Sequence, residues 1–363
     1  MRLVKSWFER QFNNPQVVIL TVILLMVFGV VYFLGKMLVP LFAGLIIAYL
    51  LDGVVKQFSK RGVPRLLAVI ITFLFFMLLL FFSIFWLVPM LTKQITSLVQ
   101  QLPTMIGEAQ TLLLQLPEHY PKFISEEQVF EMFSVIRGEV GKLAQNILAI
   151  SAASVVGLIT LLVYLILVPL LVFFFLKDKD KILSWFAGFM PSDRSLAVRV
   201  WEDVNLQIAN YIRGKSWEII IVWVATYLVF SLLNLQYSML LGLVVGFSVL
   251  IPYVGAAVAT IPIALVAYFQ WGFGSEFVWV LIAYAIIQLI DGNILAPLLL
   301  AEVVNIHPVG VITAILVFGG LWGFWGIFFA IPLATLIQVI LNAWPKQEDI
   351  ASLKEPEPDV QEK

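Results

Sequence analysis

Apolar runs close to the length that crosses a lipid bilayer recur along the whole sequence. A transmembrane helix needs about 20 consecutive apolar residues. About eight segments approach that length, namely 17–35, 37–51, 66–90, 152–176, 217–233, 238–269, 277–299 and 309–342. The chain is 61% hydrophobic and only 12% charged, whereas a soluble domain carries about 25% charged residues. The sequence therefore predicts an all-α integral membrane protein with about eight transmembrane helices.

Two of these spans, 238–269 and 309–342, are longer than one straight crossing needs. Each contains glycine and proline: the first in 251–255 (IPYVG), and the second as the glycines of 319–326 (GGLWGFWG) followed by Pro332. Proline removes a backbone donor and glycine permits unwinding, so we expect broken or re-entrant helices that line a cavity. The residues expected along this substrate or ion path are Pro252, Tyr253, Gly255, Gly319, Gly320, Gly323 and Gly326. The alternative is close helix packing through small residues four positions apart, such as Gly242/Gly246 and Gly319/Gly323.

The placement of lysine and arginine predicts the orientation of the chain. Basic residues gather before the first span, after the second and over 177–215, so these segments should face the cytoplasm. Both termini should then be cytoplasmic, with Arg213 and Lys215 at the cytoplasmic membrane surface. Segment 91–151 is richer in glutamate and should face outside. Its apolar residues recur every three or four positions, which predicts two amphipathic helices.

These features divide the chain into five consecutive segments. Residues 1–90 hold the N-terminal tail and three spans, and 91–151 form the extracytoplasmic helical segment. Residues 152–216 hold the fourth span and a cytoplasmic segment, 217–344 form a C-terminal transport core, and 345–363 form a disordered tail.

Asp291 stands at the end of an apolar run in the predicted transport core. A charge at the centre of a bilayer costs at least about 2.5–3.5 kcal/mol, and the sequence offers no basic residue nearby. Asp291 could be protonated, bind a cation, face water or pair with a distant base. The functional interpretation is a cation- or proton-sensitive site with Gln288 and Asn293 as polar partners. The alternative is a helix end in ordinary Asp-Gly-Asn turn chemistry.

Signatures of enzymes are missing from the sequence. The chain has no cysteine, no nucleotide-binding G-x-x-x-x-G-K-[ST] loop and no H-E-x-x-H motif. We expect no catalytic residues, no metal and no cofactor, and the net charge of −1 argues against a nucleic-acid partner. Glu302, Asn305 and His307 form a short polar stretch that either senses pH, gates transport, or is a loop with a satisfied histidine.

Six stretches carry a resemblance to a known family: 169–180, 210–215, 251–255, 291–297, 305–308 and 319–326. Together they resemble the autoinducer-2 exporter family of PerM-type permeases, over about residues 5–345. The resemblance implies a multi-pass protein of the bacterial inner membrane that assembles as a homopentamer. It also implies an elevator-like movement and a small-molecule or ion substrate.

Three functions fit these observations. The first is a secondary transporter that exports a small polar solute such as autoinducer-2. The second is a sodium- or proton-coupled cation antiporter on the same scaffold. The third is a membrane scaffold that transports nothing and holds partners on 91–151 or 177–215.

Overall fold

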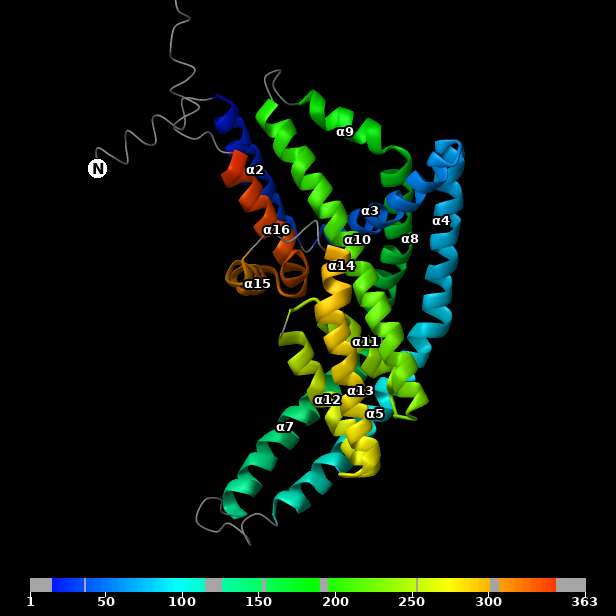
Figure 1. Ribbon diagram of the computed structural model, residues 1–363, viewed down its shortest axis with the longest axis vertical. Coiled ribbons are helices and arrows are strands. Elements are labelled where there is room, and N and C mark those ends of the chain that lie inside the picture. Colours follow the sequence, from blue (N-terminus) through cyan, green and yellow to red (C-terminus); the bar gives the residue numbers. More distant parts are fainter. Residues whose placement is uncertain are drawn as a thin grey trace, which may run out of the picture. The chain divides into compact units, whose positions relative to one another are not determined.

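The computed structural model describes residues 15–35, 37–114, 126–151, 155–189, 195–252, 254–300 and 307–343 (Figure 1). Every regular element in these ranges is a helix, which confirms the predicted all-α class. The chain forms two compact units. The first contains Met1–Phe42, Asp178–Gly214 and Leu300–Lys363, and the second contains Ala43–Lys177 and Lys215–Leu299.

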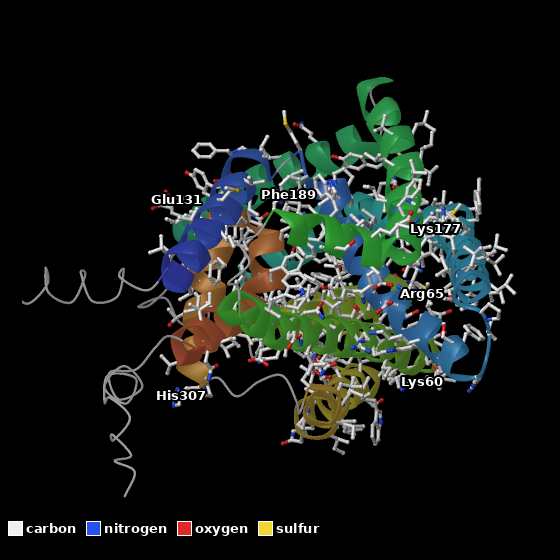
Figure 2. All side chains as sticks on the ribbon, turned by 90° about the horizontal axis from the view of Figure 1, so that it is seen from above. Lys60, Arg65, Glu131, Lys177, Phe189 and His307 are labelled. Carbon is white, nitrogen blue, oxygen red and sulfur yellow. The ribbon has the colours of Figure 1, made fainter. Side chains whose placement is uncertain are left out.

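Three helices of the second unit pack around a small apolar core: α3 (Val39–Lys60), α4 (Arg65–Phe82) and α8 (Val155–Lys177). Its buried side chains are Ala48, Val55, Ala68, Val69, Val172 and Leu176. The end of α3, the start of α4 and the end of α8 lie at one end of this unit (Figure 1). Lys60, Arg65 and Lys177 mark these ends, and they lie on one side of the molecule in Figure 2. Basic residues thus cluster at one end of the second unit.

The chain runs from α4 through a π-helix, η1 (Ser83–Leu87), into α5 (Val88–Leu113) without a break. The π register has a local cause, because Pro89 has no N–H for the carbonyl four residues before it. Val88 instead donates to the carbonyl of Ser83, five residues back. α7 (Glu126–Ser151) packs along α5, where Arg137 donates to the side chain of Gln110. The two amphipathic helices predicted within 91–151 are therefore present.

A second core in the same unit joins α10 (Ser195–Leu232), α11 (Ser238–Ser248), α12 (Val254–Trp271) and α13 (Ser275–Ile290). Gly246 lets α11 approach α10 closely, since a Cβ there would lie 2.8 Å from the Cβ of Trp223. The Gly242/Gly246 packing alternative is thus confirmed for this pair of helices. The helix run of α13 continues through a π-helix, η2 (Asp291–Leu295), into α14 (Ala296–Leu300).

In the first unit, α15 (Pro308–Trp322) and α16 (Phe324–Ala343) form a tight helical hairpin. Gly323 joins them at φ +59°, and a Cβ on Gly326 would lie 1.8 Å from the carbonyl oxygen of Phe318. The unit also holds α2 (Pro15–Leu34), α9 (Lys179–Gly188) and the first part of α10. Tyr211 of α10 donates to the carbonyl of Phe328 at 3.3 Å.

Five helices in the described ranges are long and apolar enough to cross a membrane: Val39–Lys60, Arg65–Thr111, Val200–Leu232, Val254–Trp271 and Ser275–Leu300. Leu161–Lys177 with Lys179–Gly188 forms a broken pair that counts as a sixth. The other two predicted spans, 17–35 and 309–342, fall on shorter apolar helices. Segment 309–342 folds back on itself at Gly323, and 238–269 is divided into α11 and α12, so both long segments are broken as predicted.

Candidate functional site

Asp291 lies where α13 gives way to the π-helix η2. Pro297 has no N–H for the carbonyl of Asn293, and the helix widens before it, so that Ala296 donates to the carbonyl of Asp291 five residues back. The Asp291 side chain is turned inward and is only 8% exposed. Its Oδ1 atom is buried and has no hydrogen-bond partner among the described residues. A buried carboxylate oxygen without a donor is costly, so Asp291 remains the candidate cation- or proton-sensitive position that its sequence surroundings predict.

A buried ion pair on α10 belongs to the same site. Lys215 Nζ lies 2.9 Å from Oε2 and 3.1 Å from Oε1 of Glu218, one helical turn further along α10. The two side chains are 3% and 2% exposed. The charge of Lys215 acts on Asp291, and the charge of Asp291 acts on Glu218. We call Lys215, Glu218 and Asp291 the charged cluster.

The structure bears on one of the four possibilities that the sequence leaves open for Asp291, a distant base. The charge of Lys215, which lies 76 positions earlier (291 − 215), acts on Asp291, while Asp291 Oδ1 still has no hydrogen-bond partner among the described residues. One ammonium faces two carboxylates, so the fully ionised cluster carries a charge of −1. Net negative charge inside a membrane protein attracts a proton or another cation.

A chain of hydrogen bonds on α13 connects Gln288 to the break between α11 and α12. Gln288 Nε2 donates to Tyr284 Oη at 2.8 Å, and Tyr284 Oη donates to the carbonyl of Ala256 at 2.7 Å. Tyr284, Gln288 and Asp291 recur at helical spacing and thus share one face of α13. Tyr284 is not among the residues predicted from the sequence, although this spacing is a signal that could have identified it.

Three residues of the predicted path, Pro252, Tyr253 and Gly255, belong to this break between α11 and α12. The backbone is tightly packed there and leaves no room for a side chain on Gly255. Gly255 is the second residue of α12, and a Cβ there would lie 1.7 Å from the carbonyl oxygen of Ser248. Pro252 lies in the turn before α12, and Tyr253 lies outside the described residues. Asn293 is exposed and donates to the carbonyl of Leu289 within its own helix at 2.8 Å. The structure therefore connects Gln288 through Tyr284 to Ala256 in the first turn of α12, whereas Asn293 is exposed and bonds within its own helix.

The remaining predicted residues fall in the first unit. The α15–α16 hairpin holds Gly319, Gly320, Gly323 and Gly326, and a Cβ on Gly320 would meet nothing within 4 Å. His307 caps α15, accepting the N–H of Val309 on Nδ1 at 3.3 Å, which fits the interpretation as a satisfied histidine. Arg213 bonds to the carbonyl of Ala209 and to Asn210 on its own helix. Glu302 and Asn305 lie outside the described residues.

α10 carries further polar residues that were not predicted as site residues from the sequence. Glu218 was not singled out, although its spacing of three from Lys215 inside an apolar run was a signal for an ion pair. Trp223 Nε1 and Thr226 Oγ1 are buried on the same helix without a hydrogen-bond partner among the described residues. Across the described ranges, no group of three histidine, cysteine, aspartate or glutamate side chains could hold a metal ion.

Comparisons with known proteins agree along almost the whole chain. The sequence profile of a family described as "AI-2E family transporter" matches residues 21–346. The "Putative permease PerM" of Escherichia coli K12 is 43% identical over 345 residues, covering 95% of this chain and 98% of that protein. YueF of Bacillus subtilis 168 is 25% identical, covering 85% and 84%. The "AI-2 transport protein TqsA" of E. coli K12 is 24% identical, covering 94% and 96%.

Proposed function

Because this chain belongs to the AI-2E transporter family, we propose that it is a cation-coupled secondary transporter that exports a small polar solute. The relatives are named as permeases and transport proteins rather than enzymes. The name of TqsA supports autoinducer-2 (AI-2) as the first solute to test. Membership in the family makes this chain a multi-pass membrane transporter, and the solute, direction and coupling are the parts that we propose.

The charged cluster is the observation that carries the proposal. Lys215, Glu218 and Asp291 are at least nine-tenths buried within helices that are candidate spans. With all three ionised, the cluster carries one negative charge in a medium that penalises charge. Uptake of one proton or sodium ion brings its charge to zero. Binding of a cation therefore lowers the cost of moving the cluster through the membrane, which is the physical basis of coupling.

The same cluster favours a second candidate function, a cation antiporter that moves no organic solute. A site of charge −1 exchanges one proton for one sodium ion without any further ligand. The Lys215 ammonium beside the carboxylates favours a proton over sodium, because a metal cation would face a like charge at short range. The two candidates differ in whether AI-2 or only cations cross the membrane.

Topology and assembly form part of the proposal. We place the end of the second unit with Lys60, Arg65 and Lys177 in the cytoplasm, because lysine and arginine are retained there. The α5–α7 hairpin extends from the other end of this unit (Figure 1), which supports an outside location for it in the bacterial inner membrane. The cytoplasmic termini rest on the placement of lysine and arginine in the sequence. The division into two compact units supports an elevator-like movement. A homopentamer is the assembly that the family resemblance implies.

Efflux from proteoliposomes tests the proposal. Vesicles holding AI-2 and the purified full-length protein are placed under imposed proton or sodium gradients. We expect gradient-dependent efflux of AI-2 with the wild type and loss of that dependence with Asp291→Asn. Glu276→Gln is the matched control, since Glu276 is an exposed acid in the first turn of the same helix and should leave efflux unchanged.

Each other outcome of this experiment has a definite meaning. Cation flux without AI-2 efflux, again lost in Asp291→Asn, would favour the antiporter. Equal efflux by wild type and Asp291→Asn at every gradient would remove the charged cluster from the mechanism. No flux of AI-2, sodium or protons from folded protein would favour the non-transporting scaffold.

A further inference from the structure

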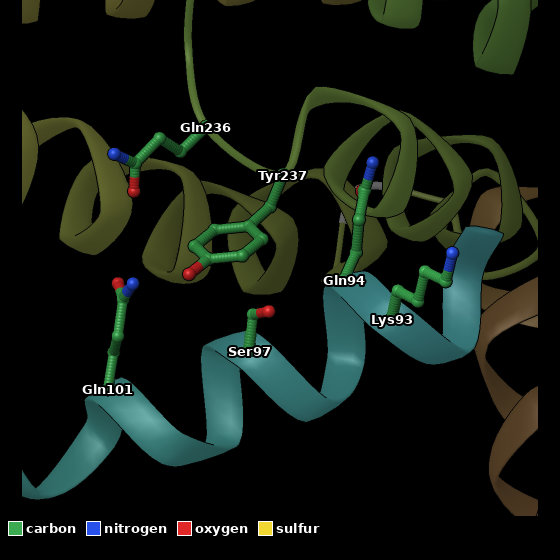
Figure 3. Close-up of a pocket in the computed structure, with 6 residues that line it drawn as sticks. All are labelled: Lys93, Gln94, Ser97, Gln101, Gln236 and Tyr237. Atoms are coloured by element: carbon green, nitrogen blue, oxygen red, sulfur yellow. The ribbon is translucent and has the colours of Figure 1, made fainter.

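An open pocket of about 340 Å³ lies in the second unit between α5 and the loop that joins α10 to α11 (Figure 3), and its lining combines polar groups with the apolar stems of long side chains. Its lining residues are Lys93, Gln94, Ser97 and Gln101 from α5, with Gln236 and Tyr237 from the loop. Ligand sites in proteins have volumes of roughly 300–1,000 Å³, so this pocket suits a small solute. We call it the α5 pocket. The proposed function uses none of these residues.

The loop side of the α5 pocket is held in an unusual conformation. Asn234, at φ 57°, is an ordinary left-handed cap of α10, because the N–H groups of Asn234 and Leu235 bond to the carbonyls of Ser231 and Phe230. Tyr237 also has positive φ, at 56°, and for a bulky residue this conformation is strained and persists only where neighbouring groups hold it. Gln270 of α12 stabilises this loop conformation, because its side chain accepts the N–H of Gln236 and donates to the carbonyl of Asn234, both at 2.8 Å.

A third hydrogen bond connects the start of α11, directly after this loop, to α5. Gln94 accepts the N–H of Leu240 at 2.9 Å. The two walls of the α5 pocket, α5 and the 233–237 loop, are thus fixed before any ligand arrives. Preorganised walls reduce the ordering cost of binding. The lining side chains of Lys93, Ser97, Gln101 and Gln236 are exposed, so a ligand can reach the pocket directly.

The chemistry of the lining indicates which solute it suits. Ser97 and Gln101 rise from α5 toward Tyr237, whose hydroxyl faces the amide of Gln101 (Figure 3). Burial raises the pKa of the Tyr237 phenol, so its hydroxyl stays protonated and can donate. Carboxamides and hydroxyls both donate and accept, which matches neighbouring hydroxyl groups on a ligand. Lys93 is the one charged lining residue, and it disfavours a cation.

We propose that the α5 pocket binds a small polyhydroxylated solute, neutral or singly negative, on the outer side of the membrane. Its place on α5, toward the end of the second unit opposite Lys60 and Lys177, puts it on the exit side in the proposed topology (Figure 1). The inference rests on the proposed function, since it names the solute class and the point where an exported solute is last held. It adds a site that the charged cluster does not provide.

Calorimetric titration of the purified full-length protein tests the site, with D-ribose, ribose 5-phosphate and choline as probes. We expect both sugars to bind saturably and choline not to bind. Gln101→Leu should weaken ribose binding about tenfold, because it removes an amide with several hydrogen bonds and keeps the volume. Gln100→Leu is the matched control, since Gln100 is the exposed neighbour on α5 outside the pocket lining.

A second variant tests the charge preference. Lys93→Gln should weaken the binding of ribose 5-phosphate by a larger factor than that of ribose. Saturable choline binding, absence of saturable ribose binding, or an equal loss in Gln100→Leu and Gln101→Leu would each overturn the proposal.

Efflux measurements separate this inference from the proposed function. Ribose binding with no gradient-driven flux would overturn the proposed function and support the site. A second outcome is AI-2 efflux that is lost in Asp291→Asn but is equal in Gln101→Leu and the wild type. This outcome would overturn the exit role of the α5 pocket and support the proposed function. Reduced efflux in Gln101→Leu, with gradient dependence retained, supports both.

Discussion

At the scale of single residues, the Lys215–Glu218 ion pair is the contact whose loss should cost most. Removing one partner of a buried pair leaves an uncompensated charge and costs about 3–5 kcal/mol. Lys215→Gln would leave two buried carboxylates, Glu218 and Asp291, without their base. We therefore expect a large fall in the thermal unfolding temperature of the purified protein. The double variant Lys215→Gln/Glu218→Gln should recover much of it, because the second charge is removed as well.

A surface pair with the same spacing is the control for that experiment. Lys142 and Glu139 are also three residues apart and lie 2.7 Å from each other, but their side chains are 69% and 63% exposed. Exposed pairs contribute little, so Lys142→Gln should leave the unfolding temperature almost unchanged. If Lys215→Gln is as stable as Lys142→Gln, the buried pair has no structural role.

The same residues show how far the sequence could predict the site. An acid in an apolar run identified Asp291, because the cost of burying charge is a local property of the sequence. Its base could not be identified in that way, since Lys215 is on a different helix and only the fold brings the two together. Lys215 was expected at the membrane surface from its place in a basic segment, and its side chain is 3% exposed in the structure.

At the scale of the elements, the α15–α16 hairpin depends on the absence of one side chain. A Cβ on Gly326 would lie 1.8 Å from the carbonyl oxygen of Phe318, and backbone cannot yield as a side chain does. Gly326→Ala should therefore sharply lower the yield of folded protein in size-exclusion chromatography. Gly320→Ala is the control, since a Cβ there meets nothing within 4 Å and alanine favours the helix by about 1 kcal/mol. Equal yields of the two variants would contradict this packing.

Proline alone does not predict where a helix changes, because four prolines lie inside uninterrupted α-helices: Pro103, Pro169, Pro262 and Pro332. Before Pro252 the helix ends, and α12 starts only at Val254. Before Pro89 and Pro297 the helix continues through a π turn instead. The difference depends on whether neighbouring carbonyls find another donor, which is a matter of three-dimensional surroundings. For the same reason, the fold-back of 309–342 at Gly323 could be suspected from composition but not distinguished from a single bent crossing.

At the scale of the whole molecule, hydropathy was sufficient for the all-helical membrane class, because the length of an apolar run is fixed by the thickness of the bilayer. Hydropathy could not predict the two compact units. Each unit gathers segments that are distant in the sequence, and a division into consecutive segments follows only the order of the chain. Which segments pack together depends on side-chain contacts such as Gly246 against Trp223.

The proposed topology can be tested directly because the chain has no cysteine. Single cysteines at Lys60, Lys177 and Glu131 give labelling sites without a background. Glu131 lies on the α5–α7 hairpin, and the two lysines lie at the basic end of the second unit (Figures 1 and 2). In intact spheroplasts, a membrane-impermeant maleimide should label Glu131→Cys and should label Lys60→Cys and Lys177→Cys only after permeabilisation. The reverse labelling pattern would mean that the orientation is opposite to the proposed one, with the α5 pocket on the entry side. Labelling of all three cysteines from the same side would mean that the chain does not cross the membrane between Glu131 and the two lysine positions.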